Sequence, residues 1–205
     1  MLFQSSSGIS QEVHVVPFHS SGNKIELDIS NDLGHPISML VVRPLRLPSW
    51  LTLDPENQEI SYLQVKEHRT VQFCFAVEEH APVHHPEKIE FAVTARSGTN
   101  WKTEVALSVS PPSSFRLFQN YPNPFNPETR ISYELREDSH VTLAIFNVTG
   151  QMVVCLADED ERAGYHEIIW NAANFAGSMY LVRLSAHRGN GEQLFRATRK
   201  IVLIK

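Results

Sequence analysis

Metal-ligating side chains gather at one place in the N-terminal half of the sequence. They are carboxylates and imidazoles within ten positions: Glu78, Glu79, His80, His84, His85 and Glu87. Their nitrogen and oxygen atoms are ligands that a zinc ion accepts. However, Pro82 and Pro86 interrupt the stretch, so no regular strand would fix the donors in place. We predict a solvated loop here, with a metal site as the alternative.

A second candidate site is the acidic run in the C-terminal half, formed by Asp158, Glu159, Asp160 and Glu161. Carboxylate oxygens bind Ca²⁺, but the run lacks the alternating ligand positions of a calcium loop. We therefore predict a solvated acidic loop, which ends at Ala163 and Gly164.

Two tryptophans, Trp50 and Trp101, could form a platform on which a sugar stacks. Aromatic side chains of a small β-sandwich more often pack in its core or at its edge, so packing is the preferred interpretation. No arrangement of Ser, His and Asp, of Cys and His, or of paired carboxylates has a supporting motif around it. We expect no enzyme and no cofactor.

Composition places the chain among globular proteins and excludes two classes of function. Hydrophobic residues make up 42% and charged residues 20% of the 205 positions, and the formal net charge is −5. Neither half carries the basic stripe of a nucleic-acid-binding protein. No apolar run approaches the roughly 20 residues of a membrane span, so no membrane insertion is expected.

The first residues lack the basic start and apolar middle of a signal peptide. We expect residues 1–11 to be a leader that is disordered or artificially added. If the protein is exported, its signal peptide lies elsewhere, and the chain is the carboxyl-terminal piece of a longer precursor.

Residues 12–109 read as short alternating apolar runs separated by turn residues. The predicted strands are residues 13–18, 24–30, 37–42, 59–65, 69–77, 88–96 and 101–109. The alternation is clearest at Val71, Phe73, Phe75 and Val77, which would share one face of a strand. Strands at this spacing predict an antiparallel β-sandwich.

A proline-rich boundary follows. Residues 110–114 form a linker of proline and serine, and residues 115–127 contain Pro122, Pro124 and Pro127 among asparagines. Proline removes a backbone donor and fixes φ, so this Pro–Asn segment can be neither helix nor interior strand. Its apolar residues predict that it packs against the domain that follows: Leu117, Phe118, Tyr121 and Phe125.

Residues 115–205 read as a second sandwich of about seven strands. Ile131, Tyr133 and Leu135 alternate with polar residues, and Gly150 can supply the positive φ of a turn. The predicted fold is therefore all-β, with two immunoglobulin-like antiparallel β-sandwiches in tandem.

The second sandwich resembles a known family. The matching stretches are QNYPNPFNPETRISYEL (119–135), VTLAIFNVTGQ (141–151), AGYH (163–166), GSMYLVRL (177–184) and RKIVLIK (199–205). Together they resemble the type A C-terminal sorting domain (Por secretion tail) of the type IX secretion system in Bacteroidetes-type bacteria. The immunoglobulin-like module of hook-capping proteins is similar. The first sandwich, with PLRLPSWLTLDP at 44–55, loosely resembles immunoglobulin-like accessory domains of secreted bacterial enzymes.

The resemblance implies a sorting signal at the end of a larger secreted or cell-surface protein. Such a signal is recognised by the outer-membrane translocon after passage through the periplasm, and a sortase-like peptidase usually removes it. The first sandwich would separate the signal from an N-terminal cargo domain. Localisation is then extracellular or at the cell surface.

The terminal strand, flanked by the only lysines after Lys102, is the predicted recognition element. The resemblance assigns recognition to Lys200, Ile201, Val202, Leu203, Ile204, Lys205, Gly150, Gln151, Gly177 and Tyr180. We expect an exposed strand edge that offers backbone hydrogen bonds, together with the two lysine charges. The family prefers the order Ser-Gly-x-Tyr. This chain has Gly177, Ser178, Met179 and Tyr180, so its glycine lies one position earlier.

Two other classes remain open. The chain could be a structural module of a surface assembly. Alternatively, Trp50, Trp101 or the loop from His80 to His85 could bind a carbohydrate or a partner protein.

Overall fold

A computed structural model describes residues 13–205, so the leader predicted at residues 1–11 lies outside the described residues. The chain divides into two compact units, Met1–Ser110 and Pro111–Lys205. Residues 13–205 form strands, turns and loops without a helix, which confirms the all-β prediction. Accordingly, no helix that could span a membrane occurs in that part of the chain.

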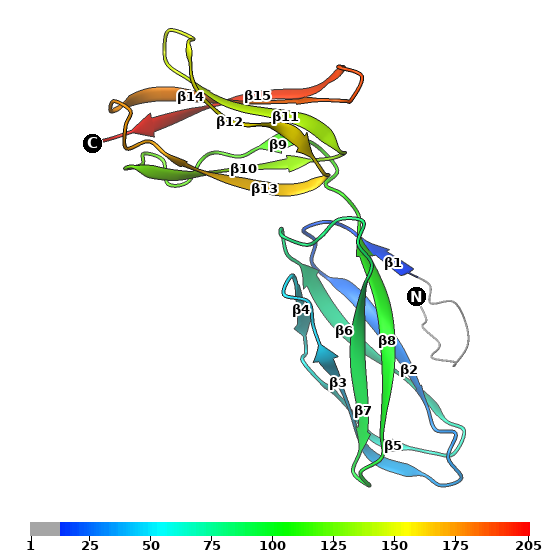
Figure 1. Cartoon of the computed structure of the whole chain (residues 1–205). Coiled ribbons are helices and arrows are strands. Elements are labelled where there is room, and N and C mark those ends of the chain that lie inside the picture. The colour runs from blue at the N-terminus through cyan, green and yellow to red at the C-terminus, as the bar shows by residue number, and fades with distance from the viewer. Residues whose placement is uncertain (1–12) are drawn as a thin grey trace. The chain divides into compact units, whose positions relative to one another are not determined.

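The first unit is a sandwich of two sheets (Figure 1). One sheet has the strand order β1-β8-β7-β3-β5 and the other β2-β6-β4. The strands are β1 (Val13–Val16), β2 (Asn23–Ser30), β3 (Ile37–Arg46), β4 (Leu51–Asp54), β5 (Gln58–Leu63), β6 (His68–Val77), β7 (Glu87–Ala95) and β8 (Asn100–Val109).

The alternating apolar residues of β6 face the core between the two sheets, as predicted. Val71, Phe73, Phe75 and Val77 are buried, and the ring of Phe73 lies 5.1 Å from that of Phe91 on the facing sheet. Two details differ from the prediction. The short strand β4, enclosed between Pro48 and Pro55, was not predicted, and β1 runs parallel to β8.

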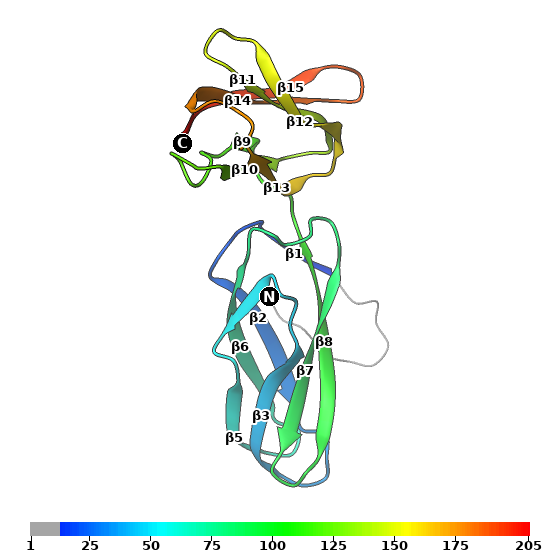
Figure 2. The same cartoon turned by 60° about the vertical axis from the view of Figure 1, so that its left-hand side comes forward.

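The second unit is also a sandwich, and its two layers are visible in Figure 2. Its sheets have the orders β12-β11-β14-β15 and β13-β10-β9. The strands are β9 (Arg116–Leu117), β10 (Glu128–Leu135), β11 (Ser139–Phe146), β12 (Met152–Glu161), β13 (Gly164–Asn171), β14 (Ser178–His187) and β15 (Gln193–Leu203).

The core of the second unit lies between these two sheets. Ile131, Tyr133 and Leu135 of β10 face Leu143 and Ile145 of β11, and all five are fully buried. The acidic run, predicted as a loop, is instead the last part of β12 and pairs with β11. The pairing lengthens this strand because the neighbouring β11 offers backbone partners up to Ser139.

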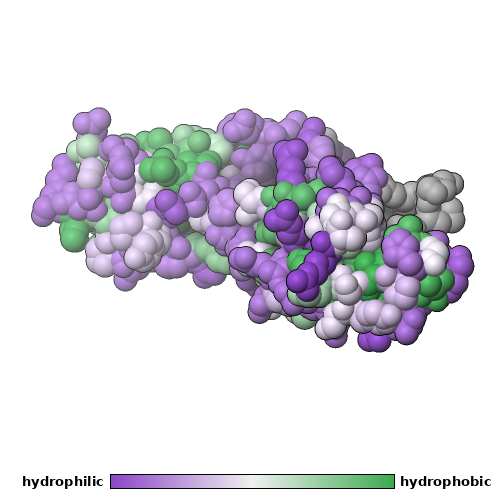
Figure 3. Space-filling model, turned by 90° about the horizontal axis from the view of Figure 1, so that it is seen from below, coloured by the Kyte–Doolittle hydropathy of each residue, from purple (hydrophilic) through white to green (hydrophobic). Residues whose placement is uncertain are grey.

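The surface is mixed. Hydrophilic side chains cover most of the face in Figure 3, with hydrophobic ones showing between them. Some exposed apolar side chains are ordinary for a folded protein.

Candidate recognition site at one end of a sheet

The ten predicted recognition residues lie at the same end of the sheet β12-β11-β14-β15. At this end Phe146 of β11 pairs with both Met152 and Leu181, and Leu181 pairs with Lys200. Gly150 and Gln151 lie in the β11–β12 turn beside this row. The fold thus brings together three stretches that are up to about 50 positions apart in the sequence.

Burial divides these residues into two groups. Ile201, Leu203 and Tyr180 are 0%, 2% and 6% exposed, so they build the core and cannot contact a partner in the folded unit. The exposed or half-buried members are Gly150, Gln151, Gly177, Lys200, Val202, Ile204 and Lys205.

The expectation of an exposed edge along the terminal strand is wrong for residues 200–204. The Pro–Asn segment covers that edge: Phe125 N donates to Val202 O (2.9 Å), and Ile204 N donates to Phe125 O (3.0 Å). Asn123 Oδ1 accepts from Val202 N at 3.0 Å, and Gln119 Nε2 donates to Lys200 O at 2.8 Å. Prolines cannot donate to a ladder, and here the Gln119 side chain supplies a donor while the Asn123 side chain supplies an acceptor.

The unpaired part of this edge lies earlier in β15. The backbone groups of Lys200, Val202 and Ile204 point away from β14, and this direction alternates along a strand. Those of Arg196 and Thr198 therefore point outward as well, and no other residue of 13–205 bonds to them.

An aromatic cluster anchors the Pro–Asn segment. The Trp170 ring lies 5.4 Å from Phe125, 5.5 Å from Phe175 and 5.6 Å from Tyr180. The Tyr180 hydroxyl donates to Ala176 O at 2.8 Å. Phe125 is buried as predicted, whereas Tyr121, predicted to pack, is 79% exposed.

Two glycines of the site differ in their role. Gly150 adopts φ +83°, as expected for the turn, and Gly177 does not adopt a positive φ. A Cβ at Gly177 would lie 3.6 Å from Leu203 O, an ordinary contact. The shifted glycine therefore places the backbone beside the terminal strand without a left-handed bend.

Asn147 holds the turn around Gly150. Its Oδ1 accepts hydrogen bonds from Thr149 N at 3.1 Å and from Gln151 N at 2.9 Å. Gly150 N donates to Asn147 O at 3.0 Å. These bonds fix the turn that presents Gln151 at the end of β11 and the start of β12.

We predict that Gly150→Ala lowers the free energy of unfolding of the C-terminal unit by about 1–2 kcal/mol. No atom lies within 4 Å of the added Cβ, so the effect comes from the left-handed backbone alone. Urea denaturation measures it. Gly189→Ala is the matched control, since Gly189 is equally open and lacks a positive φ; an equal loss in both variants would contradict the explanation.

The acidic run does not form the solvated loop that was predicted. Glu161 accepts hydrogen bonds from the Tyr133 hydroxyl at 2.8 and 3.0 Å, and its Oε2 lies 3.2 Å from His166 Nδ1. Burial, followed by the bond to Glu161, raises the pKa of Tyr133, so its hydroxyl stays a donor. Asp158 and Asp160 flank His140 at 3.2 and 2.9 Å, and their hydrogen bonds raise its pKa.

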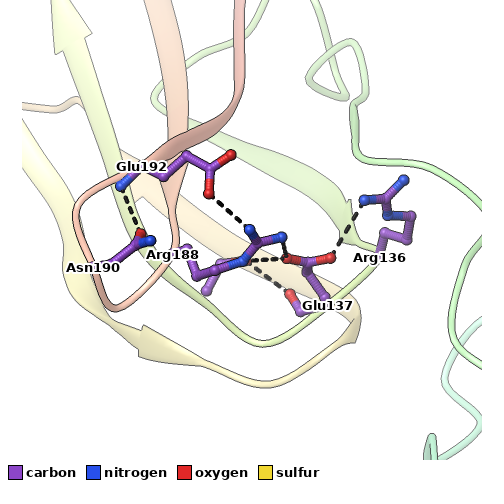
Figure 4. A network of polar contacts seen from close by, with 6 residues as sticks. Arg136, Glu137, Arg188, Asn190 and Glu192 are labelled. Carbon is purple, nitrogen blue, oxygen red and sulfur yellow. Dashed lines mark hydrogen bonds and ion pairs between the residues drawn. The ribbon is translucent and has the colours of Figure 1, made fainter.

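A separate polar network ties the loops at the opposite end of the sheet (Figure 4). Arg188 Nη2 donates to Glu137 Oε1 at 2.6 Å and its Nη1 to Glu192 Oε2 at 2.7 Å, while Arg136 Nη2 lies 3.3 Å from Glu137. The hydrogen bond from Arg188 lowers the pKa of Glu137. This network joins the β10–β11 loop to the β14–β15 hairpin, so Arg188 is already paired.

In the first unit the candidate chemistry is sparse. Residues 78–86 form the connection between β6 and β7, as predicted, and no group of three His, Cys, Asp or Glu side chains within residues 13–205 could hold a metal ion. Trp50 is 5% exposed, and its Nε1 lies 3.4 Å from Glu87 Oε1, so it is a core residue and cannot be a sugar platform. Trp101 is half-buried and lines a cavity of about 380 Å³ beside Asp28 and Asn100.

Comparisons with solved structures give low scores. The chain is 11% identical to the CupB2 chaperone of Pseudomonas aeruginosa, over 93% of this chain and 97% of that one, with a TM-score of 0.31. It is 13% identical to dimeric latent PorU of Porphyromonas gingivalis, over 98% of this chain and 20% of that one, at a TM-score of 0.38. Likenesses this low carry no argument about function. A search of curated proteins found no match.

The chain thus consists of two β-sandwiches in tandem. In the C-terminal one, the end of β15, the β11–β12 turn and the start of β14 lie at the same end of one sheet. Residues 119–202 match the family model described as a secretion system C-terminal sorting domain. This unit is therefore a type IX sorting domain of the Por secretion tail family, a non-catalytic family. Such a tail implies export to the cell surface or the extracellular space.

Proposed function

We propose that the C-terminal unit is the signal by which the outer-membrane translocon of a type IX system recognises a larger protein, after that protein has crossed the periplasm. The match of residues 119–202 to the sorting-domain family carries this proposal. A sortase-like peptidase then removes the signal, and the released protein stays at the surface or leaves the cell.

The first unit has the role of a spacer in this proposal. Its core is complete in itself, with both sheets contributing buried side chains. No residue of the unit is assigned to catalysis, and the cargo is an N-terminal domain outside this chain. A carbohydrate or protein ligand for this unit, bound beside Trp101, stays an alternative prediction.

Recognition in this proposal uses the exposed residues at the end of the sheet. Lys200, Lys205 and Gln151 are exposed there, whereas Ile201 and Leu203 keep β15 in the core. The buried members of the terminal strand thus contribute by placing the lysines. Since the edge of β15 is covered at residues 200–204, strand addition to β15 would have to use Arg196 and Thr198.

A secretion assay tests the proposal. The whole chain is fused behind a Sec signal and a fluorescent reporter, and expressed in a type IX-competent bacterium and in its translocon-deficient mutant. Reporter in the medium or at the surface of the first strain, and in the periplasm of the second, is the expected result. Retention in the periplasm of both, with the fusion folded, would reject the sorting role.

A further inference from the structure

The outer face of the sheet β12-β11-β14-β15 carries a row of exposed and half-buried side chains. Met152, Phe146, Leu181 and Lys200 lie directly opposite one another across the four strands. Met179 and Val202 form the next pair on the same face. Neighbouring positions such as Ile145, Val182 and Ile201 point into the core, which places the row on the other side of the sheet.

The row is apolar over three of its four strands. Met152 is 60% and Met179 39% exposed, while Phe146, Leu181 and Val202 are half-buried. Side chains on one face of adjacent strands touch, so these five form a continuous patch. An apolar patch that is continuous in this way marks interaction surfaces more often than scattered residues do.

Three cationic side chains lie along the same face, and they are Arg183, Arg196 and Lys200. Arg183 pairs in register with Thr198, so Lys200 and Arg196 are its two diagonal neighbours across the β14–β15 ladder. Diagonal neighbours on an antiparallel pair are about 7–8 Å apart. Within residues 13–205, none of the three forms an ion pair with a carboxylate.

Arg183 is the least satisfied of them. Its guanidinium stacks on the Phe146 ring at 4.3 Å, and its buried Nε has no hydrogen-bond acceptor among residues 13–205. Buried polar groups are nearly always bonded, and each exception calls for an explanation. The carboxylates that register places on this face, Asp158 and Asp160, are already bonded to His140.

We propose that this outer face is the docking surface of the sorting domain, and that it binds an acidic and apolar surface of a protein of the translocation machinery. A partner carboxylate would pair with Arg183 and its cationic neighbours, since arginine suits carboxylates in a desolvated site. The apolar row between Met152 and Met179 fits apolar side chains beside that carboxylate. A bare polyanion would leave this row in water, which is why a protein is the chosen partner.

The proposal rests on the sorting role, and the reporter fusion of the whole chain tests both. Arg183→Gln removes a charge from the face and Met179→Gln removes an apolar side chain. Each is expected to lower the exported fraction of reporter about tenfold or more. The matched controls are Arg162→Gln and Ile169→Gln, which change an exposed arginine and a 60% exposed apolar residue elsewhere on the unit. Both controls are expected to be exported like the parent.

The outcomes separate the two proposals. Export of the parent together with normal export of both face variants would overturn the docking surface and leave the sorting role intact. Failure of the parent to be exported would reject both. Loss with Arg183→Gln alone would indicate a polyanion in place of a protein. Melting temperatures of the purified chains verify that each variant is folded; if Arg183→Gln is not, Arg196→Gln and Lys200→Gln take its place.

Discussion

Replacing Phe125 with alanine is expected to lower the free energy of unfolding of the C-terminal unit by about 3–5 kcal/mol. Phe125 is 1% exposed and its ring packs on Trp170 at 5.4 Å, so the shorter side chain leaves a cavity beside Trp170 in the aromatic cluster. Its backbone also bonds to Val202 and Ile204, and loosening the residue weakens the hold on the terminal strand. Urea denaturation measures the loss, and amide hydrogen exchange locates it.

Tyr121→Ala is the control for this prediction. Tyr121 belongs to the same Pro–Asn segment but is 79% exposed. Its replacement is expected to change the free energy of unfolding by about 0.5 kcal/mol or less. Faster exchange at residues 200–204 is expected only for Phe125→Ala. Similar losses in both variants would show that the segment as a whole, and not its buried ring, stabilises the unit.

Removal of residues 201–205 is expected to abolish export of the reporter. The truncation takes Ile201 and Leu203 out of the core and deletes the partners of Asn123 and Phe125. It also deletes Lys205, so it destroys the fold and the recognition site together. Reporter fluorescence outside the cells, relative to the parent fusion, is the measurement. Normal export of a stably folded truncation would contradict the proposed role of the terminal strand.

A second variant separates these two causes. Lys200→Gln with Lys205→Gln keeps Ile201 and Leu203 and changes only exposed charges. We expect this double variant to fold with nearly the parent stability and to be exported at least several times less well. Parent-like export would mean that the terminal strand acts through stability alone.

The strands could be predicted because their pattern is local. The alternation at Val71–Val77 and at Ile131–Leu135 identifies a buried face within a few residues, and each proved to be one. The turn at Gly150 was predictable for the same reason, since a glycine between two apolar runs is a local signal for positive φ.

The covered edge of β15 could not be predicted, because it depends on distant residues. Asn123 and Phe125 meet Val202 almost 80 positions later, and nothing within either stretch specifies that pairing. Similarly, the sequence alone presents Glu161 as one more charge of an acidic run. Its contacts with Tyr133 and His166 become known only from the fold. The outer face would have been accessible to sequence analysis: if Val182 and Leu184 face the core, Arg183 must face away.

The bonds between the Pro–Asn segment and β15 also have a consequence for how the unit forms. They join residues 119–125 to residues 200–204, so the structure of each of these two stretches depends on the other. Contacts of such high sequence separation raise the contact order and close late in folding. While the chain emerges in order from the ribosome, the domain can reach its final state only after residue 204 has appeared. Complete folding therefore requires a full-length signal. A chain that ends before residue 204 cannot form these bonds, and we expect it to be more sensitive to proteolysis.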